Sequence, residues 1–244
     1  MSLSERQKNI LLSIIEKYVQ TAEPVGSEEI ARFSNFALSS ATIRNEMAIL
    51  EEKGYLYQPH TSAGRIPTDK GYRFFVNHIT TQNLHQMDAN EQRMLETELV
   101  KLKLREKMMA RTLARLLSTF SHNMAITGLL EEKKFFESGI KELITQPDFQ
   151  NTDEICQIAE MLDYLDENIE EITQELEPKK IKTLIGQEHF FTKSGECAII
   201  ISQCLLPEGE KGIIAILGPK RMEYRRNISI IENVVKFLED KSKL

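Results

Sequence analysis

The chain has 244 residues, of which 41% are hydrophobic and 28% charged, and its formal net charge is −6. This composition excludes a disordered chain, and the length leaves room for two small domains and a connector. No run of about 18 apolar residues occurs, which argues against a membrane-spanning helix. The first residues carry charges and no small-residue cleavage site, so we expect no signal peptide and a cytoplasmic protein.

The first part of the chain predicts two helices separated by a break. Apolar residues recur at helical spacing from Ile10 to Val19, and Ser4 is placed to cap this helix. Pro24 and Gly26 interrupt the pattern. Ser27 is then placed to cap a short second helix.

The next part predicts a third helix, a hairpin and a fourth helix. Ser39 or Ser40 caps the third helix, which stops at Gly54. A short strand over 55–58 leads into a tight polar loop over 59–66, and a second capped helix follows. Three helices, a wing and a closing helix are the parts of a winged helix-turn-helix, a fold that places one helix in the major groove of DNA. We therefore predict a winged-helix DNA-binding domain over residues 1–80.

The third helix has two different faces. Ile43, Met47 and Leu50 form an apolar stripe, whereas the opposite face presents small residues around Asn45, with Arg44 at its flank. Asparagine can read adenine and arginine can read guanine, each through two hydrogen bonds. Spacing alone also fits ordinary surface residues, but the adjoining wing favours DNA contact. The predicted DNA-binding residues are Ser40, Thr42, Arg44, Asn45, His60, Thr61, Ser62, Arg65, Lys70 and Arg73.

Charge is distributed unevenly along the chain. Residues 1–80 hold nine Lys/Arg and nine Asp/Glu, whereas residues 131–180 hold five and fifteen. The acidity therefore lies away from the predicted DNA reader. We expect DNA affinity to come from a local basic patch around the wing and the fourth helix.

The middle of the chain, residues 81–180, predicts long helices that form a linker and a dimerisation region. Apolar residues follow heptad spacing from Leu95 to Phe120, interrupted only by Glu106, and again from Ile155 to Leu176. The first segment is basic and the second acidic, so the two should pack together, within one chain or between two. The predicted dimerisation residues are Leu95, Leu99, Leu102, Met109, Leu113, Leu116, Ile155, Leu162, Leu165 and Ile169.

The last part, residues 181–244, predicts a small sheet with a helix. Two near-continuous apolar runs, CAIIISQCLL and KGIIAILG, flank a turn and are typical of strands covered on both faces. A helix over 224–238 follows. Arg221, Arg225 and Arg226 near its start could bind an anion, although a solvated helix start explains them as well. The fold class is thus α+β and mainly helical.

No pattern for catalysis, a cofactor or a metal was found. Cys156, Cys197 and Cys204 have neither paired spacing nor a nearby histidine, so we expect buried thiols, and a redox switch is not required. There is no nucleophile with a base, no pair of catalytic carboxylates and no phosphate loop. We therefore expect no enzyme.

One long string makes a family resemblance specific. Residues 39–76 read SSATIRNEMAILEEKGYLYQPHTSAGRIPTDKGYRFFV, which resembles the signature of the HrcA family of heat-inducible transcription repressors. The opening SERQKNILLSIIEKYVQTAEPVGS and the segments SGIKELITQPDFQ, IGQE and GIIAILGPKRMEYRRNISIIENV are also similar to that family. The resemblance implies repression of chaperone operons by a homodimer on an inverted-repeat operator in double-stranded DNA, with a GroEL-type chaperonin as a further partner.

The resemblance also has a gap. Family members usually have a larger, GAF-like C-terminal region with an inserted dimerisation element. Only EEKKFFESGI stands where strands and that insertion are expected, so the effector region is a reduced GAF-like domain. Two alternatives to a repressor remain open. One is an enzyme, or a regulator that senses a small-molecule effector through its C-terminal domain, with the winged helix as an accessory; the other is a winged helix used only for protein contacts.

Overall fold

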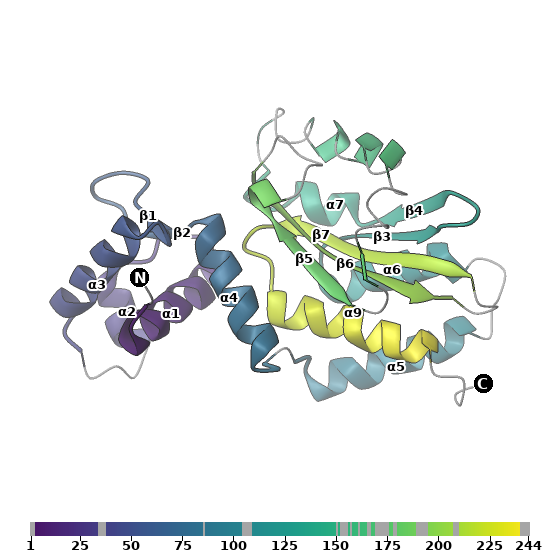
Figure 1. The fold of residues 1–244 in the computed structure, drawn as a ribbon, viewed down its shortest axis with the longest axis horizontal. Coiled ribbons are helices and arrows are strands. Elements are labelled where there is room, and N and C mark those ends of the chain that lie inside the picture. The colour runs from purple at the N-terminus through teal and green to yellow at the C-terminus, as the bar shows by residue number, and fades with distance from the viewer. Residues whose placement is uncertain are drawn as a thin grey trace. The chain divides into compact units, whose positions relative to one another are not determined.

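The protein folds into two compact units, Met1–Asn83 and Leu84–Leu244, each described here by itself (Figure 1). The structure is a computed structural model. It describes residues 3–33, 38–84, 86–103, 109–149, 151, 156, 158–160, 162–164, 167–168, 176–177, 180–188, 195–206 and 210–239.

Unit 1 has the predicted winged-helix order. It contains α1 (Glu5–Thr21), α2 (Ser27–Phe33), α3 (Ser40–Glu52), β1 (Leu56–Tyr57), β2 (Ile66–Pro67) and α4 (Asp69–Thr81). The two strands pair antiparallel, and Val25 adds a backbone bridge to Arg65 at the base of the wing.

Side-chain caps fix the helix starts in this unit. Ser4 forms a capping box with Gln7, and the amide of Thr42 donates to the Ser39 hydroxyl over 3.1 Å. Thr68 accepts in the same way from the amide of Gly71, at 3.2 Å. These bonds satisfy donors that a helix start otherwise leaves unpaired. They confirm Ser4 as a cap, show that Ser39 rather than Ser40 caps α3, and identify Thr68 as the cap of α4.

The apolar stripes meet in one core. Ile10 and Ile14 of α1, Ile43 and Leu50 of α3 and Ile79 of α4 are fully buried. Burying side chains of this size stabilises a fold by about 1.5–3 kcal/mol each. The core therefore holds α3 with its apolar stripe inward and its opposite face in solvent.

Unit 2 is built on one antiparallel sheet. Its elements are α5 (Ala89–Lys103), α6 (Met109–Ser121), β3 (Met124–Leu129), β4 (Lys134–Ser138), α7 (Ile140–Ile144), β5 (Ile181–Ile185), a 3-10 turn (Gly186–Glu188), β6 (Cys197–Leu205), β7 (Lys211–Pro219) and α9 (Tyr224–Glu239). The strand order is β4-β3-β7-β6-β5. The central strands β6 and β7 are buried almost throughout, as their apolar sequences predicted.

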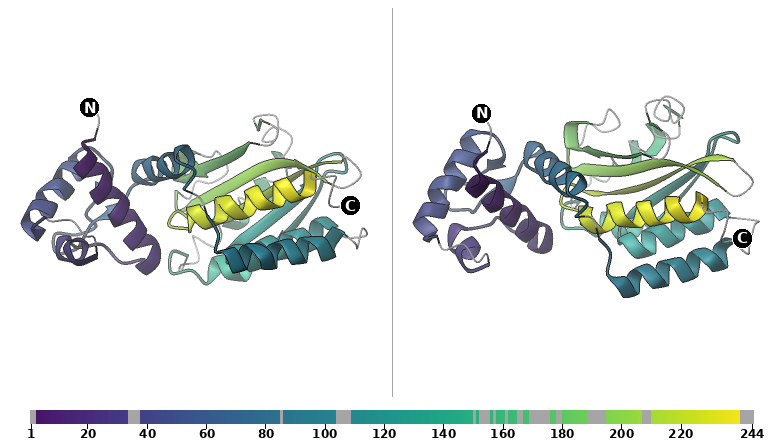
Figure 2. Two further views of the ribbon diagram at one scale, coloured as in Figure 1. Left: turned by 90° about the horizontal axis from the view of Figure 1, so that it is seen from below. Right: turned by 60° about the horizontal axis from the view of Figure 1, so that its bottom comes forward.

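Helices cover the two faces of this sheet. On one face lie α6 and α9, and α5 packs against both of them; Figure 2 shows α9 along this face with α5 beside it. The hydroxyl of Thr127 in β3 donates to the Ala110 carbonyl of α6 over 2.7 Å, which marks this face. The other face carries a second apolar cluster that includes Ile126, Leu143 and Phe149.

The boundary expected at residue 180 is wrong. Residues 124–138, expected in a helical linker, form the hairpin β3–β4, and β3 pairs along its whole length with β7. The sheet therefore joins the predicted linker to the predicted effector domain in one unit. The error arose because β3 and β4 are short and their apolar patterns are not distinctive until β7 is placed beside β3.

The first heptad pattern also has a different role from the one expected. It is divided between α5 and α6, which pack against each other, and its leucines are buried inside a single chain. Exposure is 0% at Leu95, 1% at Leu99, 4% at Leu102, 9% at Met109, 0% at Leu113 and 9% at Leu116. Leu162 is partly buried against the sheet, and Ile155, Leu165 and Ile169 lie outside the described residues. Heptad spacing requires a covered helix face but does not say which element covers it.

Candidate nucleic-acid interface

The outer face of α3 is open to solvent. Ala41, Arg44, Asn45 and Ala48 are exposed, on the side opposite the buried stripe. Three of the four are small or short, so a groove floor can approach the helix closely. Ser40 and Thr42, at the helix start, are half-buried.

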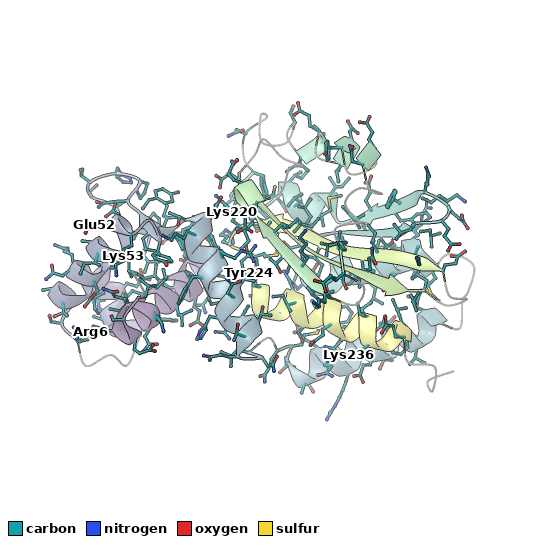
Figure 3. The ribbon with its side chains drawn as sticks, viewed as in Figure 1. Arg6, Glu52, Lys53, Lys220, Tyr224 and Lys236 are labelled. Carbon is teal, nitrogen blue, oxygen red and sulfur yellow. The ribbon has the colours of Figure 1, made fainter. Side chains whose placement is uncertain are left out.

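Contacts with α1 fix the orientation of α3. Glu46 accepts a hydrogen bond from the Gln7 amide over 3.1 Å and lies 3.4 Å from the Arg6 guanidinium. The Lys53 ammonium, at the end of α3, donates to the side-chain oxygen Oε1 of Gln7 over 3.0 Å. Arg6 and Lys53 are labelled in Figure 3. Held at its middle by Glu46 and at its C-terminal end by Lys53, α3 has little freedom to lose when the protein binds DNA.

The wing is held by one glutamine. The Gln58 side-chain amide donates to the Thr61 carbonyl at 3.0 Å and to the Ala63 carbonyl at 2.8 Å. The Gln58 backbone amide in turn donates to Glu51 of α3 over 3.1 Å. The exposed residues His60, Thr61 and Ser62 therefore stand on a braced loop. Gln58 is not among the residues predicted from the sequence, because an amide side chain at a strand end carries no distinctive signal.

Glycine is required where the wing meets the turn before α2. A Cβ on Gly64 would lie 2.4 Å from the carbonyl carbon and oxygen of Val25. The close approach allows the Arg65 amide to donate to the Val25 carbonyl over 2.9 Å. Gly64 thus sets the distance between the wing and the helix-turn-helix.

A groove of about 440 Å³ separates α3 from the wing. Arg44 and Met47 line one side, and the wing residues Thr61 to Arg65 line the other. Of the predicted DNA-binding residues, the structure brings Arg44, Thr61, Ser62 and Arg65 to this groove. Lys70 and Arg73 of α4 do not line it.

Arg65 lies differently from what the sequence suggested. Its Nε is 2.8 Å from a Glu51 carboxylate oxygen, and its side chain is only 17% exposed. Arg65 is one of the predicted DNA-binding residues. Its charge is instead opposed by an acid of α3, which sequence spacing did not reveal.

Lys70 supports the hairpin from the start of α4. Its ammonium donates to the Lys53 carbonyl over 2.7 Å and lies 4.4 Å from the centre of the Tyr55 ring. The side chain remains exposed. It can offer charge to a phosphate while packing on the aromatic ring.

Among the described residues, no group of three or more His, Cys, Asp or Glu side chains could hold a metal ion. No helix within the described ranges is long and apolar enough to cross a membrane.

Comparison with known proteins agrees with this geometry. Residues 2–81 match the family model described as the winged helix-turn-helix transcription repressor, HrcA DNA-binding, and residues 68–228 match the HrcA protein C terminal domain. The heat-inducible transcription repressor HrcA of Acetivibrio thermocellus is 66% identical over 83 residues, which cover 34% of this chain and 24% of that protein.

A second relative matches along the whole chain. The heat-inducible transcription repressor HrcA of Brevibacillus brevis is 28% identical over 341 residues, covering 97% of each chain. This alignment is longer than the 244 residues of the present chain, so the relative has stretches without a counterpart here. A crystal structure of a hypothetical protein shares the fold over 100% of both chains, with a TM-score of 0.78 and 20% identity. With family models matching both its winged helix and most of its second unit, the chain belongs to the HrcA family of heat-inducible transcription repressors.

Proposed function

We propose that this protein represses chaperone genes by binding an inverted-repeat operator as a homodimer in the cytoplasm. The observation that carries the proposal is the exposed face of α3, with Arg44 and Asn45, beside a braced wing. A helix with this face fits the major groove while the wing lies along the adjacent backbone. The family to which the chain belongs supports the same role.

The homodimer follows from symmetry rather than from a contact in the structure. A two-fold operator is read most tightly by two copies of a reader at fixed spacing. Six of the ten residues expected to form the dimer are buried inside one chain. Ile155, Leu165 and Ile169 keep their proposed role, and the reduced GAF-like character of unit 2 is part of the same proposal.

Heat inactivation and a GroEL-type chaperonin complete the proposal. Unit 2 has to hold two readers at one spacing, so its partial unfolding would release the operator before unit 1 melts. A chaperonin that refolds unit 2 would restore repression. The proposal involves no catalysis.

The test is a mobility-shift titration of the full chain. The probe is a chaperone promoter fragment with an inverted repeat, and the competitor is the same fragment with one half-site scrambled. We expect a single shifted band at a ratio of two chains to one duplex, resistant to the scrambled competitor. If the unlabelled intact fragment and the scrambled fragment competed equally well with the probe, sequence-specific repression would be contradicted.

A further inference from the structure

Unit 2 contains a cavity of about 690 Å³ beside β4. Four consecutive residues of that strand, from Phe135 to Ser138, line it. The remaining lining comes from α6, from the sheet and from the segment above the sheet: Arg111, Arg115, Ile126, Ala159, Leu162, Asp163, Ile199, Ile201, Ile213 and Ala215.

The cavity lies over one face of the sheet and reaches its β4 edge. Ile126, Ala215 and Ile201 are register partners on β3, β7 and β6, so they share the face that the cavity covers. Successive side chains of a strand point to opposite faces, and Phe136 and Ser138 of β4, with Arg111 and Arg115 of α6, extend the lining around the edge toward the other face. Within the described residues, β4 stands at the end of the strand order and pairs only with β3. Such an edge offers backbone N–H and C=O groups to a further strand.

One side of this edge is basic. Phe136 pairs with Thr127, which bonds to α6, so Phe136 lies on the α6 face. The Arg111 guanidinium lies 5.6 Å from the Phe136 ring centre. Arg115 follows one helical turn later, and both arginines are exposed.

The other side is apolar with an acidic rim. Phe135 pairs with Gly128, where a Cβ would lie 2.3 Å from the ring, so the glycine makes room for it. Beside Phe135 lie aliphatic side chains of the sheet and Leu162 above them. The exposed carboxylates of Glu137 and Asp163 line the same cavity.

We propose that the β4 edge binds an extended peptide by strand addition, and that the peptide alternates acidic and apolar side chains. Its acidic side chains would face Arg111 and Arg115, and its apolar side chains would enter the cavity beside Phe135. A slip of one residue would exchange the two sets, bringing acids toward Glu137 and Asp163. The two sides of the edge therefore select the alternation and its register.

A second copy of this chain fits the edge poorly. Antiparallel pairing of β4 with itself places the α6 helices of both copies on the same side. The four arginines would then gather there, and β4 offers only Lys134, Phe136 and Ser138 to that face. No acid of the second β4 would meet them, whereas an acidic peptide supplies the missing charge.

The test measures the anisotropy of fluorescein-labelled Gly-Glu-Val-Glu-Val-Glu-Val-Gly on titration with the full chain. Three comparison peptides carry Val-Val-Val-Glu-Glu-Glu, Lys in place of Glu, or N-methylated alternate amides. The double variant Arg111→Glu/Arg115→Glu reverses the charge at the edge. Arg93→Glu on α5 is the matched control, because Arg93 is exposed and does not line the cavity. Circular dichroism melting verifies that each variant is folded.

We expect the alternating peptide to bind, and each comparison peptide to bind at least about tenfold more weakly. The double variant should lose affinity by a similar factor, and Arg93→Glu should change it by less than about twofold. Equal binding of the alternating and block peptides, or of the N-methylated peptide, would overturn strand addition. The proposal would also be overturned if the protein bound none of the peptides but formed a dimer, and the double variant were monomeric. The edge would then bind a second copy of the chain.

Discussion

Glu51 joins α3 to the wing by two contacts. One carboxylate oxygen lies 2.8 Å from Nε of Arg65, and the other accepts the backbone amide of Gln58 over 3.1 Å. The acid therefore braces the wing and opposes the charge of the arginine next to the proposed DNA-binding groove.

Replacing Glu51 with Gln should release Arg65 while keeping the acceptor for Gln58. We expect tighter binding to nonspecific DNA and a slope of log K against log salt that is steeper by about 0.9, the effect of one additional phosphate contact. Fluorescence anisotropy at several salt concentrations measures the slope. Glu52→Gln, which removes an exposed neighbouring charge (Figure 3), is the control and should change the slope less.

Substitutions on the outer face of α3 should affect specificity. Arg44→Ala and Asn45→Ala each remove one side chain able to form two hydrogen bonds with a base, and we expect a cost of about 1–3 kcal/mol at one operator position. Competition between operator variants identifies that position. Lys8→Ala on α1 should leave the preference unchanged. Parent-like operator binding by both α3 variants would show that another element reads the bases.

Gly64→Ala tests the close approach of the wing. The added Cβ would meet the Val25 backbone at 2.4 Å, so the wing must move away and lose its bridge to Val25. We expect unit 1 to lose about 1–3 kcal/mol of unfolding free energy and operator affinity to fall with it. Gly26→Ala is the matched control, because nothing lies within 4 Å of its Cβ position. Chemical denaturation of both variants measures the difference.

A buried amide should limit the stability of unit 2. Asn227 of α9 is 0% exposed, and neither its Nδ2 nor its Oδ1 has a hydrogen-bond partner among the residues that the structure describes. An unpaired buried polar group costs roughly 1–3 kcal/mol, so Asn227→Leu should raise the melting temperature. Under the proposed function it should also raise the temperature at which the operator is released. Asn233→Leu, which removes an amide bonded to Ser229, should lower the melting temperature. A lower melting temperature for Asn227→Leu would refute the assignment.

The thiol of Cys204 gives a pH dependence. Burial, followed by the nearby charge of Glu239, raises its pKa from 9.0 to about 12. The folded state therefore retains a proton that the unfolded chain gives up, so the stabilisation is complete below pH 9 and is lost as the pH rises toward 12. Denaturation of the parent and of Cys204→Ala across this interval should show the steeper decline in the parent. In thiol labelling at pH 8, exposed Cys156 should react first.

The sequence by itself determined the winged helix. Ser4, Ser39 and Thr68 cap helices through bonds to residues three positions away. The apolar stripes of those helices lie close together in the chain and pack against one another in a single core. These signals are local, so they can be recognised without knowing what lies elsewhere in the chain. The same holds for β6 and β7, whose continuous apolar runs require cover on both faces.

Only the tertiary structure decided what the remaining patterns pack against. Leu95 and Leu113 lie in heptad stripes that fit a subunit interface or an interior equally well, and the fold buries them within one chain. β3 became recognisable as a strand only through its pairing with β7, over 80 residues away, and β4 through its pairing with β3. The Glu51–Arg65 pair likewise joins two elements whose distance the sequence does not give. Periodicity specifies that a face is covered, whereas the partner that covers it is fixed by long-range packing.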